Sequence, residues 1–401
     1  MEILCLQCRA RLFPLFGRGS RGFKLTRSSS VHIRLYATLH QPPSVQPDSK
    51  PRPAKKRSLV LKEKKKLNEV VFDEVLSNEP KRKDVQCKSL DEEWREQRID
   101  IKKLPYMYLK LSKYRLTSLV VLTTLVGYAM APSPTIPSVL LYSCVGTALC
   151  SAAANTFNQW IEVPFDSQMS RTRNRVLVRG LMSPLHALSF GIISGVTGTL
   201  ILATGVNALT ATLGVFNIIL YSAVYTPMKR LSIANTWVGS VVGAIPPVMG
   251  WTACTGTLSP SAFILAGVLF AWQFPHFNAL SWSHQGDYSR GGYRMMSVTD
   301  PLLCRKVALR YSLSLIPICT AAPVFGLTTW WFAFDSALPN LWLSYLSWKF
   351  YQDSDFKSAR RLFHFSLVHL PLLLGLMLLN KASWKTDGSP SSDKMKREHS
   401  E

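Results

Sequence analysis

The chain has 401 residues, of which 47% are hydrophobic and 18% charged, and 47 Lys and Arg against 24 Asp and Glu give a net charge of +23 at pH 7. This composition favours a membrane protein over two or three soluble domains. The distribution of the apolar residues excludes a soluble core, because apolar stretches of membrane-spanning length recur between Leu116 and Asn380. The acidic residues in this region are only Glu162, Asp166, Asp287, Asp300, Asp335, Asp353 and Asp355.

The first 40 residues have the make-up of a mitochondrial transit peptide. They hold seven Arg or Lys, a run of three serines at 28–30 and a single acidic residue, Glu2. Such a basic, acid-poor segment suits import towards a negative-inside matrix. A disordered basic tail is the alternative, and a secretory signal fits less well because arginines interrupt the apolar stretch. We predict a transit peptide over residues 1–40.

Two further segments are predicted to lie outside the folded domain. Residues 41–105 are rich in Pro and then in Lys, and hold too little apolar surface to offset the entropy of ordering, which predicts a disordered or basic linker on the matrix side. Its Lys run fits a solvated tail at a membrane surface better than a nucleic-acid site, so no nucleic-acid partner is predicted. Residues 381–401 are predicted to form a polar C-terminal tail.

Residues 106–380 are predicted to form an all-α polytopic membrane domain. Nine apolar stretches of about the length that crosses the hydrocarbon core can be drawn there. The eighth is the weakest, because Asp335 and Pro339 interrupt it. The nine predicted spans are approximately 116–135, 138–157, 182–204, 208–226, 233–252, 260–281, 307–324, 328–348 and 362–379.

The connections between these spans differ in charge. Those after the second, fourth, sixth and eighth spans carry Arg and Lys, whereas the alternate connections "PSPTIPS", "TGVNALT" and "CTGTLSPS" carry none. By the positive-inside rule every basic connection lies on one face, and nine spans then place the N-terminus on that face and the C-terminus opposite. Together with the transit peptide, this predicts a multi-pass protein of the mitochondrial inner membrane with its N-terminus in the matrix and the lipid bilayer as partner.

The stretch "NQWIEVPFDSQMSRTRNR", residues 158–175, places opposed charges where the second span leaves the bilayer. Asn158, Glu162 and Asp166 are spaced i, i+4, i+8, so on a helix they share one stripe that drifts by about 40° per step. Hard carboxylate oxygens suit Mg²⁺ shared with substrate phosphates, and Arg171 and Arg175 suit phosphate oxygens. The pattern predicts a diphosphate site, and an internally neutralised salt-bridge cluster is the alternative.

Asp287 is the next acidic residue after Asp166, and it stands where the sixth span leaves the same face. It is preceded by "FN" at 277–278, as Asp166 is preceded by "FN" at 157–158, and it is followed by Arg290. Polar groups at membrane depth are costly and usually functional. We therefore expect the second and sixth spans to face each other with their carboxylates aligned.

The motif "YTPMKR" lies in the basic connection between these two spans. Its Tyr225 and Lys229 are separated by one helical turn, and a Lys can act as a point charge on a phosphate. The alternative is a lysine that only marks topology.

Six ordered motifs over about residues 105–380 resemble those of the UbiA-like intramembrane prenyltransferases, in particular the branch that modifies heme. They are "NQWIEVPFDSQMSRTRNR", "YTPMKR", "NTWVG", "AIPPVMGW", "WQFPHF" and "DYSRGGYRMM". The resemblance implies an all-helical bundle around a central cavity. It also implies transfer of the farnesyl group of farnesyl diphosphate to a vinyl group of protoheme IX, which makes heme O for heme A synthesis and cytochrome c oxidase assembly, with hand-over to a downstream heme A synthase.

Roles are carried over from the family by position. The resemblance implies catalytic roles for Asn158, Glu162, Asp166 and Asp287, Mg²⁺ ligation by Glu162, Asp166 and Asp287, and diphosphate binding by Arg171, Arg175, Tyr225, Lys229 and Arg290. The sequence departs from the family at two places. Glu162 replaces the earlier Asp of the first motif, and Ser283 and Gly291 flank Asp287 where the superfamily commonly has a second acid.

His276 of "WQFPHF" lies within the sixth span, about three helical turns before Asp287. A histidine within a membrane could ligate heme iron or position the porphyrin. The equally simple alternative is a structural histidine that is hydrogen-bonded to a neighbouring helix.

Three other functions fit parts of the sequence. A prenyltransferase with a phenolic acceptor, as in ubiquinone synthesis, would share the diphosphate chemistry but not the context of "WQFPHF" and "DYSRGGY". A heme chaperone without catalysis would need no diphosphate site. An anion transporter would place its binding groups near the midplane of broken helices, whereas these charges gather at span ends.

Overall fold

The structure is a computed structural model, and it describes residues 101–382. The predicted transit peptide, residues 1–40, lies outside the described residues, as do residues 41–100 of the predicted linker and residues 383–401 of the predicted tail. The last five residues assigned to the linker, 101–105, already belong to helices.

Every regular element of the described chain is a helix, and the single β-bridge joins Thr328 to Lys381. The elements are η1 (Ile101–Lys103), α3 (Leu104–Leu111), α4 (Tyr114–Met130), α5 (Pro137–Asp166), α6 (Pro184–Gly205), α7 (Ala208–Ile219), the π-helical segment η2 (Leu220–Tyr225), α8 (Thr226–Leu231), α9 (Asn235–Thr255), α10 (Pro260–Ser283), α11 (Gln285–Arg290), α12 (Met296–Thr299), α13 (Pro301–Val324), α14 (Trp331–Asp353) and α15 (Phe356–Leu379).

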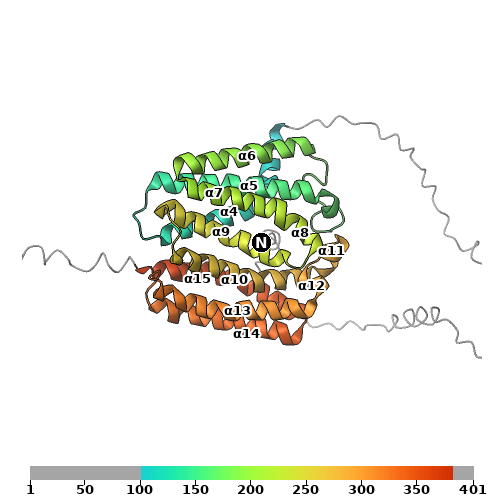
Figure 1. The fold of residues 1–401 in the computed structure, drawn as a ribbon. Coiled ribbons are helices and arrows are strands. Elements are labelled where there is room, and N and C mark those ends of the chain that lie inside the picture. The colour runs from blue at the N-terminus through green and yellow to red at the C-terminus, as the bar shows by residue number, and fades with distance from the viewer. Residues whose placement is uncertain (1–100, 383–401) are drawn as a thin grey trace, which may run out of the picture. The chain divides into compact units, whose positions relative to one another are not determined.

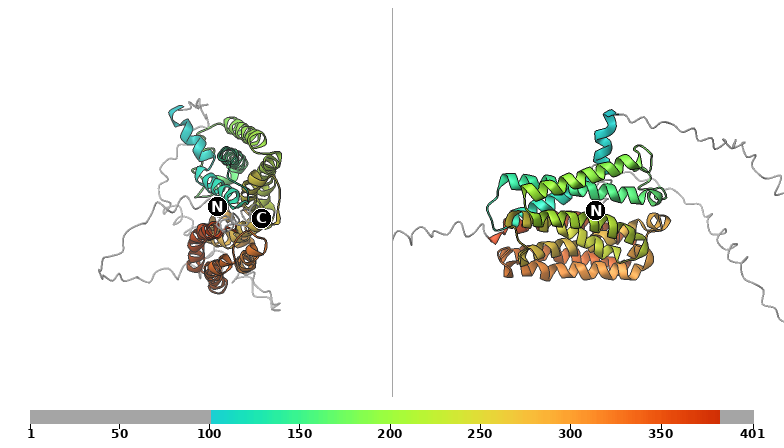
Figure 2. Two further views of the ribbon diagram at one scale, coloured as in Figure 1. Left: turned by 90° about the vertical axis from the view of Figure 1, so that its left-hand side faces the viewer. Right: turned by 45° about the horizontal axis from the view of Figure 1, so that its top comes forward.

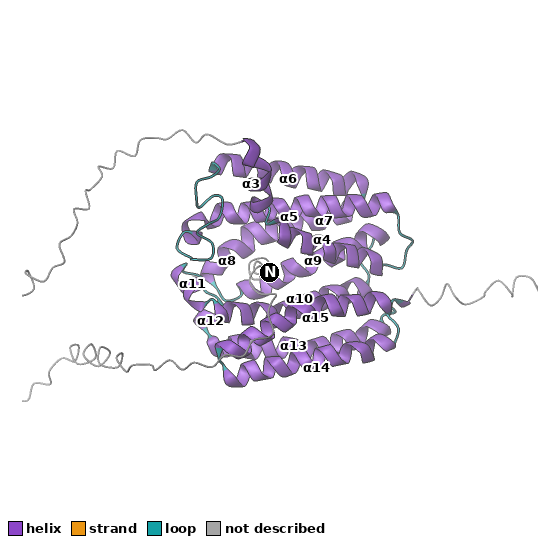
Figure 3. Cartoon of the chain, turned by 180° about the vertical axis from the view of Figure 1, so that it is seen from behind, coloured by secondary structure: helices purple, strands orange, loops and turns teal. Residues whose placement is uncertain are grey.

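The long helices lie side by side as one antiparallel bundle (Figure 1). The most extensive packing joins α5 to α6, α4 to α9, α13 to both α10 and α14, and α10 to α9 and α15. The short helices α8, α11 and α12 gather at one end, and the view from behind places them together as well (Figure 3). The left view of Figure 2 looks nearly along the axes of the long helices, whereas the short helix α3 stands across them. The all-α prediction is confirmed, and the basic connections lie at the end with α8, α11 and α12.

Seven helices among residues 101–382 are long and apolar enough to cross a membrane, namely α5, α6, α7 with η2 and α8, α9, α10, α13 and α15. Each of the nine predicted spans coincides with a helical segment, but two of them do not meet both criteria. The first, α4, has 17 residues, and α14 has 23 residues but contains Asp335, Pro339 and Asn340, which lower its mean hydropathy. A polytopic membrane protein is therefore confirmed, whereas the count of nine and its topology stay predictions.

The helices begin where the sequence carries start signals. Pro stands in the first turn of α5, α6, α10 and α13, where its missing N–H costs no hydrogen bond. The Asn207 side chain accepts from the Thr210 amide at 2.8 Å, and the Asp300 side chain accepts from the Leu303 amide at 2.9 Å. These caps satisfy amides that the helix itself leaves without partners.

Helices α4 and α9 cross with their backbones almost touching. A Cβ atom at Gly250 would lie 1.9 Å from the Thr124 carbonyl oxygen, and one at Gly127 would lie 1.9 Å from the Pro247 carbonyl oxygen. Small residues at such crossings allow the close backbone approach that drives helix association in lipid. The crossing matters for the site, because α9 forms one of its walls.

Gly250→Ala is therefore expected to lower the free energy of unfolding in detergent by about 1–3 kcal/mol, because the added methyl group would clash with backbone atoms that cannot rotate away. The unfolding temperature should fall accordingly. Gly375→Ala is the matched control, since a Cβ at Gly375 of α15 would meet nothing within 4 Å. Thermal unfolding of both variants measures the difference, and equal midpoints would contradict the described crossing.

Candidate active site

A cavity opens between α5, α8, α9 and α10, with the connection after α5 and the segment after α11 at its charged end. Seven of the predicted site residues line it, and three, namely Asn158, Asp287 and Arg290, are not among its lining residues. The seven are Glu162, Asp166, Arg171, Arg175, Tyr225, Lys229 and His276.

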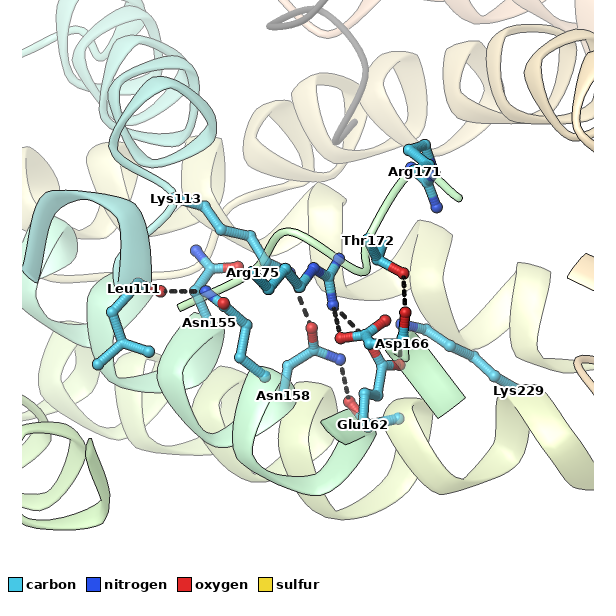
Figure 4. Close-up of polar contacts among 12 residues, drawn as sticks. Leu111, Lys113, Asn155, Asn158, Glu162, Asp166, Arg171, Thr172, Arg175 and Lys229 are labelled. Carbon is cyan, nitrogen blue, oxygen red and sulfur yellow. Dashed lines mark hydrogen bonds and ion pairs between the residues drawn. The ribbon is translucent and has the colours of Figure 1, made fainter. Parts of the chain in front are cut away.

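Two carboxylates and two cations meet at the charged end (Figure 4). Lys229 Nζ lies 2.7 Å from Glu162 Oε1, Arg175 Nη1 lies 3.3 Å from Glu162 Oε2, and Arg175 also pairs with Asp166 Oδ2. Glu162 and Asp166 are 3% and 0% exposed. Burying four charges is costly unless they are matched, and the cluster matches them one to one.

Asn158 supports this cluster from behind. Its side chain accepts from Lys113 Nζ at 2.7 Å and donates to Thr226 Oγ1 at 3.0 Å, so it ties α5 to the start of α4 and to α8 (Figure 4). Sequence reasoning had missed Lys113, for which the only signal is a lysine directly before the first span. The structure therefore places Asn158 between helices and gives its amide protein partners.

Asp287 lies on α11 and is held by the connection that follows α5. Ser170 Oγ lies 2.8 Å and 2.9 Å from the two carboxylate oxygens, and Arg290 forms an ion pair with the same group. Burial raises the pKa of Asp287, but the hydrogen bonds from Ser170 and Arg290 outweigh it and hold the pKa below its usual value. The carboxylate is thus ionised at neutral pH.

The three proposed metal ligands do not form one cluster. Among residues 101–382 no group of three or more His, Cys, Asp or Glu side chains is placed to hold a metal ion. Ser170 and Arg290 bind Asp287, which is not among the lining residues of the cavity, and Mg²⁺ ligation by Glu162, Asp166 and Asp287 stays a prediction. Arg171 lies against the same helix, with its guanidinium 5.5 Å from the centre of the Tyr288 ring.

His276 lies in the deeper wall of the cavity. Its Nδ1 is 2.8 Å from Ser366 Oγ of α15, and its ring stacks on Trp272 with the ring centres 4.6 Å apart. The residue is 1% exposed, and its Nε2 has no hydrogen-bond partner among the described residues. A buried polar atom without a partner requires an explanation, and a ligand atom in the cavity would provide one.

Tyr293 is a second residue that sequence reasoning had missed, although it lies within "DYSRGGYRMM". It lines the cavity, it is 4% exposed, and its hydroxyl has no hydrogen-bond partner in the described chain. Burial and the nearby charge of Glu162 raise its pKa, so the hydroxyl stays protonated. It can therefore donate a hydrogen bond to an anion in the cavity.

Two apolar cavities adjoin the charged one. The first, about 550 Å³, lies among α4, α5, α7 and α9 and is lined by Cys150, Gly214 and Met249 among others. The second, about 680 Å³, lies among α4, α9, α10 and α15 and reaches Trp272. Gly243 lines all three cavities, and a Cβ there would lie 2.3 Å from Gln273 Oε1. Two apolar branches thus leave one charged chamber.

The model of the UbiA prenyltransferase family matches residues 120–368, which is most of the described chain. The chain belongs to the UbiA prenyltransferase family. This assignment confirms the resemblance of the six motifs, and the matched residues include Glu162, Asp166, Arg175, Lys229 and His276.

Several relatives carry a specific name. The chain is 57% identical over 291 residues to a human protein named "Protoheme IX farnesyltransferase, mitochondrial". The match covers 73% of this chain and 66% of the human protein, which is just under two thirds of its length. A protein of the same name from Yarrowia lipolytica is 45% identical over 306 residues, covering 72% of this chain and 65% of that protein.

Solved structures share the fold of this UbiA-family chain. A digeranylgeranylglyceryl phosphate synthase in membranes matches with a TM-score of 0.61 at 13% identity, covering 71% of this chain and all of that one. A UbiA homolog from Archaeoglobus fulgidus, bound to DMAPP and Mg²⁺, matches with a TM-score of 0.51 at 14% identity, covering 67% of this chain and 98% of that one. At such identities the likeness shows the fold alone.

Proposed function

We propose that this chain transfers the farnesyl group of farnesyl diphosphate to a vinyl group of protoheme IX, which yields heme O. The observation that carries the proposal is the buried cluster of Glu162, Asp166, Arg175 and Lys229 at the junction of two apolar branches. The names of the relatives that are 57% and 45% identical support the choice of donor and acceptor.

The donor set at the charged end fits a Mg²⁺ ion shared with a diphosphate. Glu162 and Asp166 would supply carboxylate oxygens, and Mg²⁺ is usually held by one or two carboxylates together with substrate phosphates. The Archaeoglobus fulgidus homolog, which binds DMAPP and Mg²⁺, supports this reading. When bound, the metal would supply positive charge to the leaving diphosphate.

Arg175 and Lys229 would exchange partners when the diphosphate enters. They now neutralise Glu162 and Asp166, and they would donate to phosphate oxygens instead, which would leave both carboxylates available to hold the metal. Tyr225 and Arg171 line the same end and would also contact the diphosphate. Arg290 and Asp287 pair with each other on the adjoining α11 and would act without lining the cavity in its present form. Catalysis then rests on positive charge that is already in place where the leaving group becomes negative.

The reaction breaks the bond between farnesyl C1 and the diphosphate oxygen, and the electron pair leaves with the diphosphate. The π electrons of the heme vinyl group form the new carbon–carbon bond to C1. Water adds to the resulting cation on the porphyrin side chain and loses a proton, which gives the hydroxyethylfarnesyl group of heme O. The apolar walls exclude other water from the allylic cation until the vinyl group reacts.

The two apolar branches separate the substrates. The branch towards α5 and α7 offers a largely apolar lining for the farnesyl tail. The branch towards α10 and α15 contains Trp272, which stacks on His276, so the porphyrin would lie on this side with His276 Nε2 directed to the iron. The names of the relatives that are 57% and 45% identical favour protoheme IX over the ubiquinone-type alternative.

The proposed setting is the mitochondrial inner membrane, with the basic end of the bundle and the N-terminus in the matrix. Its support is the mitochondrial names of the relatives, the seven helices of spanning character and the one-sided charge of the connections. The product would then pass to a downstream heme A synthase.

Lys229→Met is expected to weaken the binding of farnesyl diphosphate by about ten- to 150-fold, because it removes one charge-assisted contact. Heme affinity should be unchanged, since Lys229 lies at the charged end and His276 in the deeper wall. Arg230→Met is the matched control, because Arg230 is exposed and stacks on Phe165 at 4.1 Å. Calorimetry measures the affinity of each variant for farnesyl diphosphate. An equal loss of affinity in both variants would contradict the assignment of Lys229.

The acceptor is tested directly by incubating the purified chain with farnesyl diphosphate, Mg²⁺ and either protoheme IX or 4-hydroxybenzoate, followed by mass spectrometry. We expect a product with the mass of heme O and none from the phenol. A prenylated phenol in place of heme O would establish the alternative acceptor. Heme binding without any product would establish a chaperone.

A further inference from the structure

A separate, partly open cavity lies at the end of the bundle opposite the charged site. It is formed by the ends of α4, α9 and α13, the start of α10 and the residues after α15. Its lining shares no residue with that of the charged cavity. The proposed farnesyl transfer gives this second cavity no role.

Two buried hydrogen-bond donors of this cavity have no partner in the described chain. Trp251 of α9 lines it, is 4% exposed, and leaves its indole Nε1–H without an acceptor. Ser259, directly before α10, also lines it and has a buried hydroxyl without a partner. An indole N–H can only donate, so the group that satisfies Trp251 must be an acceptor.

Lys381 adds a positive charge to the same lining. Its ammonium donates to the Ala131 carbonyl oxygen at 2.6 Å, which leaves two of its three N–H groups for other acceptors. Burial lowers the pKa of Lys381, so an anion beside it would offset part of the lost hydration. Among the described connections at this end of the bundle, Lys381 is the sole Lys or Arg.

The start of α10 contributes further positive potential. The helix runs for 24 residues from Pro260, and the Ser259 side chain makes no capping hydrogen bond to it. Unsatisfied amides and the helix dipole at such an end favour negative charge. Among the described residues no carboxylate lines the cavity, and the acid nearest to its lining along that part of the chain, Asp335 of α14, accepts from Asn380 at 3.1 Å.

The rest of the wall is apolar. Met130, Phe325 and Leu327 line the cavity, and the neighbouring Val324 and Trp330 are 66% and 61% exposed. Exposed aromatic and aliphatic side chains at helix ends are typical of the level at which a membrane protein meets lipid headgroups. The cavity thus joins anion-binding donors to an apolar surface at the edge of the bilayer.

We infer that this cavity binds the phosphate of an anionic phospholipid headgroup, with Trp251, Ser259 and Lys381 as hydrogen-bond donors. The apolar wall would contact the part of the acyl chains nearest to the headgroup. The site is independent of the farnesyl transfer proposed above. It would anchor the ends of α9, α10 and α15 to one lipid on the face opposite the diphosphate site.

Native mass spectrometry of the purified full chain in detergent tests the inference, with phosphatidylglycerol, phosphatidylcholine and inorganic phosphate as probes. We expect the most tightly bound lipid to be phosphatidylglycerol, which should bind in preference to phosphatidylcholine. Lys381→Gln and Trp251→Phe should each weaken it by about tenfold or more. Lys357→Gln, an exposed lysine at the opposite end of the bundle, is the matched control and should leave this binding unchanged.

Each outcome decides the matter. Preferential binding that depends on Lys381 and Trp251 but not on Lys357 supports the lipid site. Inorganic phosphate that binds with the same dependence and displaces the lipid would overturn the lipid as occupant. Equal binding of both lipids, or equal effects of all three substitutions, would overturn the site itself. Lys381 follows the last helix, so Lys381→Gln gives the answer even where Trp251→Phe does not fold.

Discussion

Asp166→Asn is expected to reduce heme O formation by about 10²- to 10³-fold while the protein remains folded in the membrane. The residue is fully buried in the cavity wall and pairs with Arg175, and it is proposed to pass from that cation to Mg²⁺ when diphosphate binds. An amide has nearly the same shape but offers no charge to the metal. Losing one preorganised electrostatic contact costs about this factor in turnover.

Asp353→Asn is the control for this substitution, since Asp353 is exposed at the end of α14. Glu162→Asp should retain part of the activity, because it keeps the charge and shortens the side chain by one methylene. Expression level, thermal stability and turnover are measured together for all three variants. If Asp166→Asn loses the folded protein and not the activity per molecule, the cluster is a structural salt bridge and the diphosphate assignment is wrong.

His276→Ala is expected to lower heme affinity by about ten- to 150-fold and to change the absorption spectrum of the bound heme, with farnesyl diphosphate affinity unchanged. The expectation rests on the His276 Nε2 atom, which is buried, lines the cavity and has no partner in the described structure. The spectrum is the decisive readout, because a residue that only packs would not alter the electronic state of the iron.

Two controls separate ligation from packing. His276→Asn keeps a side chain that can hydrogen-bond to Ser366, so it should preserve the contact between α10 and α15 but not the spectrum. His364→Ala removes an exposed histidine from α15 and should leave heme binding unchanged. An unaltered spectrum and affinity in His276→Ala would make His276 a structural residue.

The sequence predicted the carboxylates of the charged end because they are local. Glu162 and Asp166 are one turn apart on α5, so helical spacing brings them together, whereas Arg175 reaches them from the connection after α5 and Lys229 from α8. Asn158 belongs to the same stripe, but two steps of drift turn it about 80° away from Asp166. The structure accordingly places it against Lys113 and Thr226, behind the cavity wall.

The contacts that the sequence could not supply are those between segments far apart in the chain. Ser170 and Asp287 are separated by 117 residues, and their hydrogen bond depends on how the connection after α5 packs on α11. Nothing in the local pattern around Asp287 indicates this partner. The same holds for Trp251 and Lys381, which the fold brings to one cavity although they lie far apart in the sequence.

The span count shows where hydropathy alone is insufficient. The helices of the predicted first and eighth spans both exist, but α4 is short and α14 carries Asp335, Pro339 and Asn340 among its aromatic residues. Asn340 is nonetheless buried and lies 3.0 Å from His369 Nε2 of α15. Polar residues that pair between helices lower mean hydropathy without moving a helix out of the bundle.

The central claim is that one chamber holds the diphosphate between the carboxylates of α5 and the cations Arg175 and Lys229. An experimental structure of the purified chain with Mg²⁺ and farnesyl thiodiphosphate, an analogue whose C1–S bond resists cleavage, tests it most directly. The account predicts that the phosphate oxygens contact Arg175 and Lys229, that Glu162 and Asp166 hold the metal, and that the tail occupies the branch lined by Cys150 and Gly214. An analogue bound elsewhere, with the pairs Lys229–Glu162 and Arg175–Asp166 intact, would contradict it.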